Sequence, residues 1–302
     1  MNELNNFFQE CLLHALIAAK KAGEAILSVY QGQIDVTYKD DKTPLTLADE
    51  RAHSIVLNHL SIESLKEIHL LSEEGKHTPY DERKEWEYFW LVDPLDGTKE
   101  FIHRRGEFTV NIALINKNRP VLGVVLVPAS GSLYFAAEGL GSYKIENAEV
   151  VSQSINDYEN SSGENSPIDR IVNLAERLPL DHAPDTSERK ITVVGSRSHA
   201  SNALTSFVQA AEQEYENVEF IPAGSALKFG LVAEGAAHVY PRLGPTMEWD
   251  TAAGQCVVEQ SGGAVIDLTY GTPLCYNKQE LLNPHFICTE KHSRYLGDLL
   301  KI

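Results

Sequence analysis

The chain has few of the features that a stapled or membrane-spanning protein needs. Its 302 residues include only four cysteines, none of them in a CxxC pair, which favours reduced thiols over disulfides or structural zinc. No apolar run reaches the roughly 20 residues of a transmembrane helix, and no lysine or arginine precedes Lys20, so we expect no secretory signal peptide. These absences predict a cytoplasmic protein, with or without peripheral attachment to the cytoplasmic face of the inner membrane.

Positive charge is also scarce. The 26 Lys and Arg residues stand against 43 Asp and Glu residues, a formal net charge of −17, which argues against bulk binding to nucleic acid or to anionic lipid. A small basic pocket stays compatible with this balance. The length predicts two halves of about 150 residues each, 1–150 and 151–302, in a monomer or a homodimer.

Hydrophobic periodicity predicts an α/β protein. Helices are expected over residues 3–30 and from Thr43-Pro44 onward. In the first half, strands are expected over 68–71, 88–92, 108–115, 120–127 and 132–137. The polar stretch 152–190 is interpreted as a mobile insertion or linker. After it, strands over 191–194, 218–221, 237–240 and 264–268 alternate with helices over 203–212, 226–234 and 251–260.

The segment Trp90 to Thr98 carries the strongest chemical signal. An apolar strand ends in Asp93-Pro94-Leu95-Asp96-Gly97-Thr98, which delivers two carboxylates three residues apart. Proline fixes the bend, glycine lets the backbone approach a ligand, and Thr98 begins a helix whose free N–H groups favour anions. An ordinary strand-to-helix turn would explain one Asp. It explains two poorly when Glu73-Glu74 ends another strand.

Clustered carboxylates repel one another unless a cation lies between them or one stays protonated. Oxygen ligands suit Mg²⁺, which keeps coordinated waters for a substrate phosphate. Two such ions can activate water and stabilise the leaving oxygen when a phosphate ester is cleaved. This composition therefore points to metal-assisted phosphate chemistry.

The same segment resembles a motif of the inositol monophosphatase superfamily. Three further segments are similar to that family's motifs and follow in its order: Thr43-Pro44-Leu45-Thr46-Leu47-Ala48-Asp49, Leu71-Ser72-Glu73-Glu74 and Trp249-Asp250-Thr251-Ala252-Ala253-Gly254. The resemblance spans about residues 5–290 and implies a layered α/β/α/β/α sandwich with its site between the two halves. It implies lithium-sensitive hydrolysis of a phosphate monoester with two or three Mg²⁺ ions.

The resemblance also implies roles for individual residues. The metal ligands would be Glu73, Asp93, the Leu95 carbonyl, Asp96 and Asp250. Asp49 would lie near a more weakly held metal ion or near the attacking water. Thr98, with Asp49 or Glu73, would orient that water, and the N–H groups of Gly97 and Thr98 would hold the scissile phosphate. Glu74 is the weaker candidate of its pair.

The second half resembles the 3′(2′),5′-bisphosphate nucleotidase branch of that superfamily. The segments Gly195 to His199, Gly224 to Phe229 and Tyr240-Pro241-Arg242 carry this likeness, as does Lys99-Glu100. The substrate-binding residues it implies are Ser196, His199, Ser225, Lys228, Arg242 and Asp250. Lys228 and Arg242 would neutralise a second phosphate, although Lys228 and His199 are equally compatible with solvated helix positions.

This branch implies that adenosine 3′,5′-bisphosphate is hydrolysed to AMP, and that 3′-phosphoadenosine 5′-phosphosulfate is a second substrate in sulfur metabolism. An inositol monophosphatase or a sugar bisphosphatase of the same superfamily is the first alternative. A metal-dependent binding protein without activity is the second, and it leaves Asp49 and Thr98 without a role. A glycosidase with paired carboxylates is the third, and Lys228 and Arg242 count against it.

Overall fold

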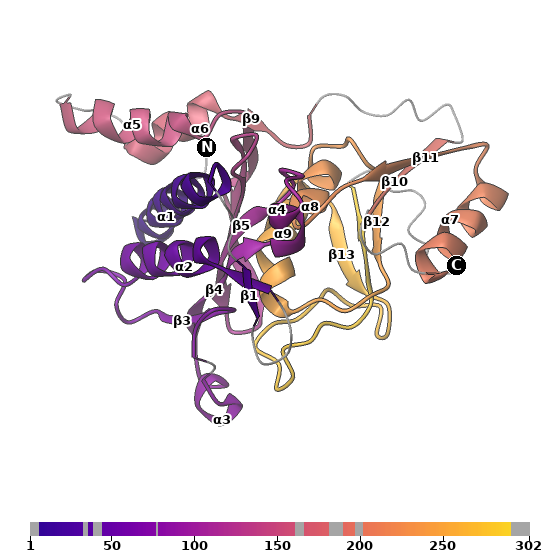
Figure 1. Cartoon of the computed structure of the whole chain (residues 1–302), viewed down its shortest axis with the longest axis horizontal. Helices are drawn as coiled ribbons and strands as arrows, with labels where there is room; N and C mark the ends of the chain where they lie inside the picture. The colour runs from indigo at the N-terminus through magenta and orange to yellow at the C-terminus, as the bar shows by residue number, and fades with distance from the viewer. Residues whose placement is uncertain are drawn as a thin grey trace.

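A computed structural model describes residues 6–32, 36–38, 44–76, 78–160, 166–180, 190–196 and 202–290. In these described residues, a seven-stranded and a five-stranded β-sheet alternate with three layers of helices, and the termini of the described chain lie in different layers (Figure 1). This is the layered α/β/α/β/α arrangement that the sequence predicts. The strongest contacts between layers bury apolar side chains, which is the main force that stabilises such a stack.

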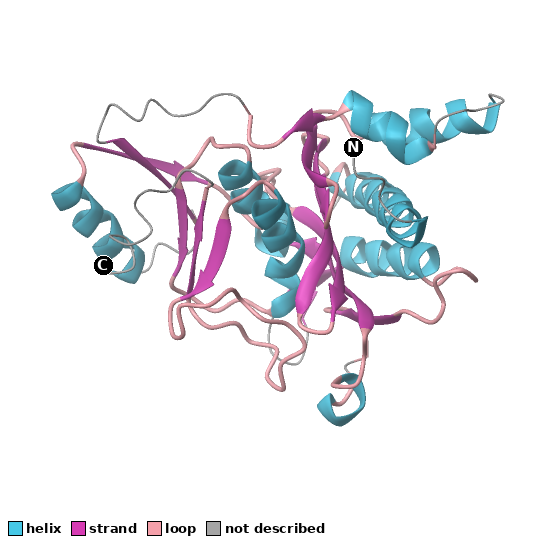
Figure 2. Cartoon of the chain, turned by 180° about the vertical axis from the view of Figure 1, so that it is seen from behind, coloured by secondary structure: helices cyan, strands magenta, loops and turns pink. Residues whose placement is uncertain are grey.

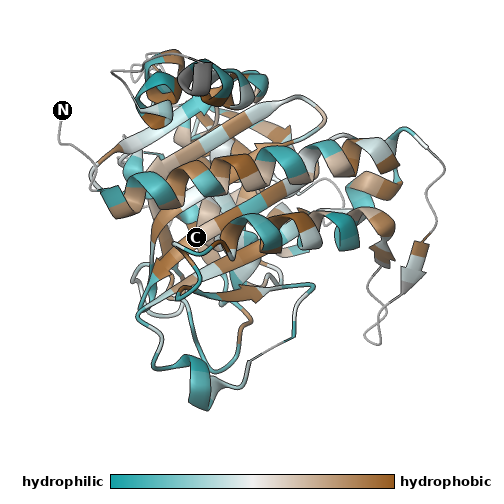
Figure 3. Cartoon of the chain, turned by 90° about the vertical axis from the view of Figure 1, so that its left-hand side faces the viewer, coloured by the Kyte–Doolittle hydropathy of each residue, from teal (hydrophilic) through white to brown (hydrophobic). Residues whose placement is uncertain are grey.

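The first helical layer covers the outer face of the larger sheet. Its members are α1 (Asn6–Tyr30), α2 (Leu47–Leu60), α5 (Glu149–Asn160) and α6 (Pro167–Leu174). Along α1 and α2, hydrophilic and hydrophobic residues alternate at helical spacing (Figure 3). The apolar stripe of α1, which includes Leu12, Leu16 and Ile26, is fully buried.

The larger sheet has seven strands in the order β3-β4-β5-β6-β7-β8-β9. Its strands are β3 (His69–Ser72), β4 (Tyr88–Asp96), β5 (Thr109–Asn116), β6 (Arg119–Val127), β7 (Ser132–Ala137), β8 (Gly141–Ile145) and β9 (Glu176–Arg177). Only β3 and β4 pair in parallel, so both end at the same edge of the sheet. The predicted strand-end carboxylates are therefore brought together there.

Two helices, α8 (Leu227–Ala233) and α9 (Glu248–Gln260), lie between the sheets (Figure 2). Small residues allow α9 to sit directly on β6, because a side chain at Gly123 would collide with the Ala253 carbonyl. The smaller sheet follows in the order β11-β10-β12-β14-β13. Its strands are β10 (Lys190–Gly195), β11 (Asn217–Pro222), β12 (Val239–Arg242), β13 (Ala264–Asp267) and β14 (Phe286–Thr289), with α7 (Asn202–Glu214) on the outside.

The start of the second helix was predicted wrongly. Pro44–Thr46 forms strand β2, which pairs with β1 (Val36–Tyr38), and helix α2 begins only at Leu47, capped by the Thr46 side chain. The polar stretch 152–190, in which 171–178 was expected as a short helix, contains the end of α5, then α6 and β9, within its described residues. Its interpretation as a mobile insertion or linker stays a prediction. Strands β8 and β14 were not predicted. Strand β9, which lies beyond residue 150, pairs with β8 in the larger sheet. The division into halves at residue 150 stays a prediction.

Candidate active site

A cavity of about 280 Å³ lies where the ends of β3 and β4 face the first turn of α9 and the start of α8. Its lining contains most of the residues singled out in the sequence: Glu73, Asp93, Leu95, Asp96, Gly97, Thr98, Ser196, Ser225, Lys228, Arg242 and Asp250. Segments separated by more than 150 residues therefore meet at one place. His199 lies outside the described residues.

The turn after β4 is shaped by its own hydrogen bonds. The Asp93 carboxylate accepts from the Leu95 backbone N–H at 3.0 Å, and the pairing with β5 shifts register between Asp93 and Asp96. Gly97 has a φ of 89°, which is favourable only for glycine. It ends the strand and caps the short helix α4 (Thr98–Ile102), so the two carboxylates and the Thr98 hydroxyl all face the cavity.

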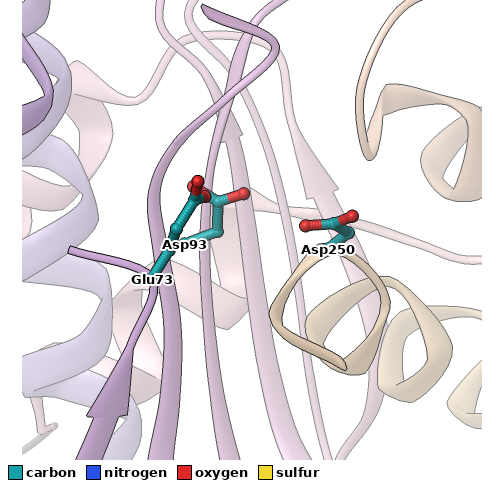
Figure 4. A group of neighbouring side chains, drawn as sticks. All are labelled: Glu73, Asp93 and Asp250. Carbon is teal, nitrogen blue, oxygen red and sulfur yellow. The ribbon is translucent and has the colours of Figure 1, made fainter. Parts of the chain in front are cut away.

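Three carboxylates from three elements converge in this cavity. Oxygen atoms of Glu73, Asp93 and Asp250 all lie within 4.8 Å of one another. Glu73 and Asp93 lie side by side at the ends of β3 and β4, and Asp250 faces them from α9 (Figure 4). Among the described residues, this is the group with the geometry to hold a metal ion.

The electrostatics of the group also fit a cation. Burial raises the pKa of Asp93 well above its usual value, and the negative charges of Glu73, Asp96 and Asp250 raise it further. Burial likewise raises the pKa of Asp250, with Asp96 and Glu73 adding to the effect. Negative charge that is buried in this way is unfavourable unless a cation or a proton offsets it. A divalent ion with oxygen ligands would meet that need.

Asp96 lies next to this group but is held differently. Its carboxylate accepts from the Asn111 side chain at 3.3 Å and from the Thr109 hydroxyl at 3.4 Å. Burial raises its pKa, and the positive charge of Lys228 partly offsets that rise. Asp96 therefore stands between the acidic group and the basic wall of the cavity.

Asp49 approaches the turn from α2. One carboxylate oxygen accepts from the Thr46 backbone N–H at 2.7 Å and from its hydroxyl at 2.6 Å, while the other accepts from the Thr98 hydroxyl at 3.3 Å. Burial raises the pKa of Asp49 to about 6 despite these bonds, and Glu74 adds to the rise. The Leu95 carbonyl, at 3.5 Å, is a second acceptor within reach of the Thr98 hydroxyl. With either acceptor, the Thr98 oxygen can itself accept a hydrogen bond from a water.

The opposite wall is basic. Lys228 is 3% exposed and donates to the Ser225 carbonyl at 2.6 Å, so the interpretation of Lys228 as a solvated residue is wrong. Arg242 donates through Nη2 to the Pro245 carbonyl at 2.7 Å. Its Nε is buried and has no hydrogen-bond partner within the part of the chain that the structure describes. An unpartnered buried donor at a cavity wall fits an anionic ligand.

The Ser225 hydroxyl joins the two sides of the cavity. It donates to the Asp96 backbone carbonyl at 2.9 Å, which fixes the start of α8 against the β4 turn. Six further lining residues were not named as site residues from the sequence: Lys99, Glu100, Phe229, Tyr240, Thr246 and Thr251. All of them except Thr246 stand inside the quoted motifs, and that position is the signal that could have marked them.

The chain belongs to the inositol monophosphatase family: its residues 9–300 match the sequence model of that family. It is 41% identical to the 3′(2′),5′-bisphosphate nucleotidase CysQ of Escherichia coli K12 over 271 residues, which is 89% of this chain and 95% of that relative. The crystal structure of CysQ from Bacteroides thetaiotaomicron superposes with a TM-score of 0.82 at 42% identity, covering 96% of this chain and all of that one.

More distant relatives share the architecture. The inositol monophosphatase from Anabaena sp. PCC 7120 is 24% identical and superposes with a TM-score of 0.67, covering 98% of this chain and 96% of the other. At that identity the likeness shows the fold alone. None of the helices that the structure describes has both the length and the apolar character to cross a membrane.

Proposed function

We propose that this chain is a Mg²⁺-dependent 3′(2′),5′-bisphosphate nucleotidase, which hydrolyses adenosine 3′,5′-bisphosphate to AMP and phosphate. One observation carries the proposal: a single cavity has a cluster of carboxylates on one side and two basic side chains on the other. A substrate with one phosphate to cleave and a second to hold matches that division. Relatives named as nucleotidases of this class, at about 41% identity over most of the chain, support it.

Glu73, Asp93, Asp250, Asp96 and the Leu95 carbonyl would hold two or three Mg²⁺ ions. When bound, such ions lower the pKa of a coordinated water and neutralise charge on the leaving oxygen. The protein's contribution is a set of buried, prepositioned oxygens, so little reorganisation is needed when the substrate binds.

Thr98 and Asp49 would orient the attacking water. The Thr98 hydroxyl donates a hydrogen bond to Asp49 and lines the cavity. Its oxygen would accept a hydrogen bond from the water. Glu73, on the same side of the cavity, is the second candidate for this task. The N–H groups of Gly97 and Thr98 would bind the scissile phosphate, in-line with that water.

The basic wall would hold the rest of the nucleotide. Lys228 and Arg242 would bind the phosphate that is not cleaved, as a point charge and as a planar fork respectively. Ser196, Ser225, His199 and Asp250 would complete the contacts to the sugar and base. Ser225 keeps acceptor capacity for a ligand while its proton bonds Asp96.

A panel of substrates tests this assignment. Purified protein is assayed for phosphate release from adenosine 3′,5′-bisphosphate, 3′-phosphoadenosine 5′-phosphosulfate, inositol 1-phosphate and fructose 1,6-bisphosphate, each with Mg²⁺ and with chelator. We expect the highest kcat/KM on the two adenosine substrates, and none with chelator. Preference for inositol phosphate or fructose bisphosphate would assign the chain to another branch. Metal binding without phosphate release from any substrate would indicate a binding protein.

A further inference from the structure

We propose that a buried polar network around residues 275–283 braces the site, and that Glu248 is its central positioning residue. The network fixes the first turn of α9, and therefore Asp250, relative to Glu73 and Asp93. This inference rests on the metal site of the proposed function. Glu248, Asn277 and Lys278 do not line the cavity, nor do Arg83 and Asn283, so these residues act through the position of Asp250.

Glu248 is fully buried, two residues before Asp250. Its carboxylate accepts from the backbone N–H groups of Asn277 at 2.7 Å and Lys278 at 2.9 Å, and from the Lys278 ammonium at 2.7 Å. Its own N–H donates to the Leu281 carbonyl at 2.9 Å. A charged side chain is rarely placed in a protein interior unless it is satisfied in this way. Here it ties a long loop to the start of α9.

Asn283 extends the network to Asp250 itself. Its side-chain amide donates to the Met247 carbonyl at 2.8 Å and to the Thr251 hydroxyl at 3.0 Å. The N–H of Met247 in turn donates to the Asp250 carboxylate at 2.9 Å. Lys278 links this branch to Glu248, because its ammonium also donates to the Asn283 side-chain oxygen at 3.2 Å. A short chain of bonds therefore runs from Glu248 to the carboxylate that faces the cavity.

Arg83 anchors the network to the other side of the site. It lies on α3 (Tyr80–Arg83), in the connection between β3 and β4, and those two strands deliver Glu73 and Asp93. Its guanidinium donates to the Asn277 side chain at 2.7 Å and to the Lys278 carbonyl at 2.5 Å. The Asn277 amide returns a bond to the Arg83 carbonyl at 2.7 Å. The brace thus spans the segments that carry the three carboxylates.

The geometry of the ligands sets the affinity for a metal. Outer partners that orient metal ligands typically change the affinity by about 10- to 100-fold when they are removed. Glu248→Gln preserves the shape of the side chain but leaves one acceptor oxygen in place of two, so either the Asn277 N–H or the two Lys278 donors face an NH₂ group instead. It should therefore weaken Mg²⁺ binding without removing any ligand.

The test measures Mg²⁺ binding to the substrate-free protein by calorimetry. We expect Glu248→Gln to weaken binding about 10-fold or more, and kcat at saturating Mg²⁺ to return close to the wild-type value. The matched control is Glu234→Gln, the same change in a buried carboxylate that accepts from Tyr134 at 3.0 Å and pairs with Lys144 at 2.8 Å, outside the cavity lining. The control should bind Mg²⁺ like the wild type.

Three results would separate the possibilities. If Glu248→Gln binds Mg²⁺ with wild-type affinity and differs from the wild type only in stability, as Glu234→Gln should, the network does not position Asp250 and the proposal is wrong. If Glu248→Gln does not fold, Lys278→Ala takes its place, because Lys278 reaches the network from a partly exposed position; wild-type affinity there also overturns it. A wild-type protein that binds Mg²⁺ but releases no phosphate from adenosine 3′,5′-bisphosphate refutes the proposed function instead, and leaves the affinity comparison valid.

Discussion

Lys228 offers a test in which a substitution should lower activity without lowering stability. Burial lowers the pKa of this lysine to about 8, and Arg242 nearby adds to the effect. At about 1.4 kcal/mol for a tenfold change in proton affinity, the difference from the ordinary 10.5 corresponds to about 3 kcal/mol of unfavourable free energy at pH 7. The protein therefore keeps a charge that destabilises its fold.

Lys228→Met removes the charge and keeps the length of the side chain. The variant also loses the bond to the Ser225 carbonyl, and a buried acceptor left unsatisfied costs about 1–3 kcal/mol. We therefore expect the free energy of unfolding to stay equal or to rise by up to about 2 kcal/mol. Activity should fall roughly 10- to 100-fold in kcat/KM, because a charge-assisted phosphate contact is lost.

Urea unfolding in chelator measures the first quantity, and phosphate release from adenosine 3′,5′-bisphosphate the second. The sign of the pH dependence gives a further check. Between about pH 8 and pH 10.5 the Lys228 amine is protonated to a larger fraction in the unfolded chain than in the folded one. The unfavourable contribution of Lys228 to wild-type stability therefore disappears as pH rises through that window, and stability increases. Lys228→Met should lack this gain. A variant that is clearly less stable and fully active would refute the reasoning and make Lys228 a structural residue.

Four other outcomes follow from the site. Asp96→Asn should preserve the fold by circular dichroism and abolish turnover, because a neutral amide is a poor Mg²⁺ ligand; near wild-type activity at saturating Mg²⁺ would exclude Asp96 as a ligand. Arg242→Ala should lose roughly 10- to 100-fold in kcat/KM on adenosine 3′,5′-bisphosphate and little on adenosine 3′-monophosphate; equal losses would place it at the scissile phosphate. Gly97→Ala should inactivate the enzyme, because its Cβ would collide with the Ser225 hydroxyl at a positive φ; Gly97→Ala with Ser225→Gly should recover part of the lost stability, and no recovery would contradict the clash. Millimolar Li⁺ should inhibit phosphate release and equal Na⁺ should not, and identical effects would indicate ionic screening instead.

The carboxylates of the β4 turn were predictable because their signal is local. A run of apolar residues ends directly at Asp93. Gly97, which follows Asp96, predicts a turn with a backbone conformation that only glycine adopts easily. Hydrophobic periodicity and turn chemistry both act over a few residues, so they can be recognised in a sequence. The convergence with Asp250 was inferred from the order of family motifs, since nothing local relates residues that far apart.

The brace was not predictable for the opposite reason. Arg83 and Asn277 are separated by 194 residues, and each stands among polar neighbours that look like an ordinary solvated loop. Only tertiary structure turns these polar side chains into buried hydrogen-bond partners. The same holds for strand β14, whose short apolar run becomes a strand because it pairs with β12 and β13 on either side.

For Lys228, the motif correctly predicted a position in the cavity, but the helix pattern wrongly predicted exposure to solvent. Its position at the start of α8 predicts a solvated residue if the helix is considered alone. That helix lies between two sheets, so the layers above and below it exclude water from the lysine. The opposite charges nearby are those of Asp96, Glu100 and Glu107. A cation held at this cost to the fold, beside carboxylates whose pKa values are raised by their own burial, gives a cavity in which both signs of charge are poorly solvated. A metal ion on one side and a substrate phosphate on the other would replace this solvation, so binding would offset the cost of burying these charges.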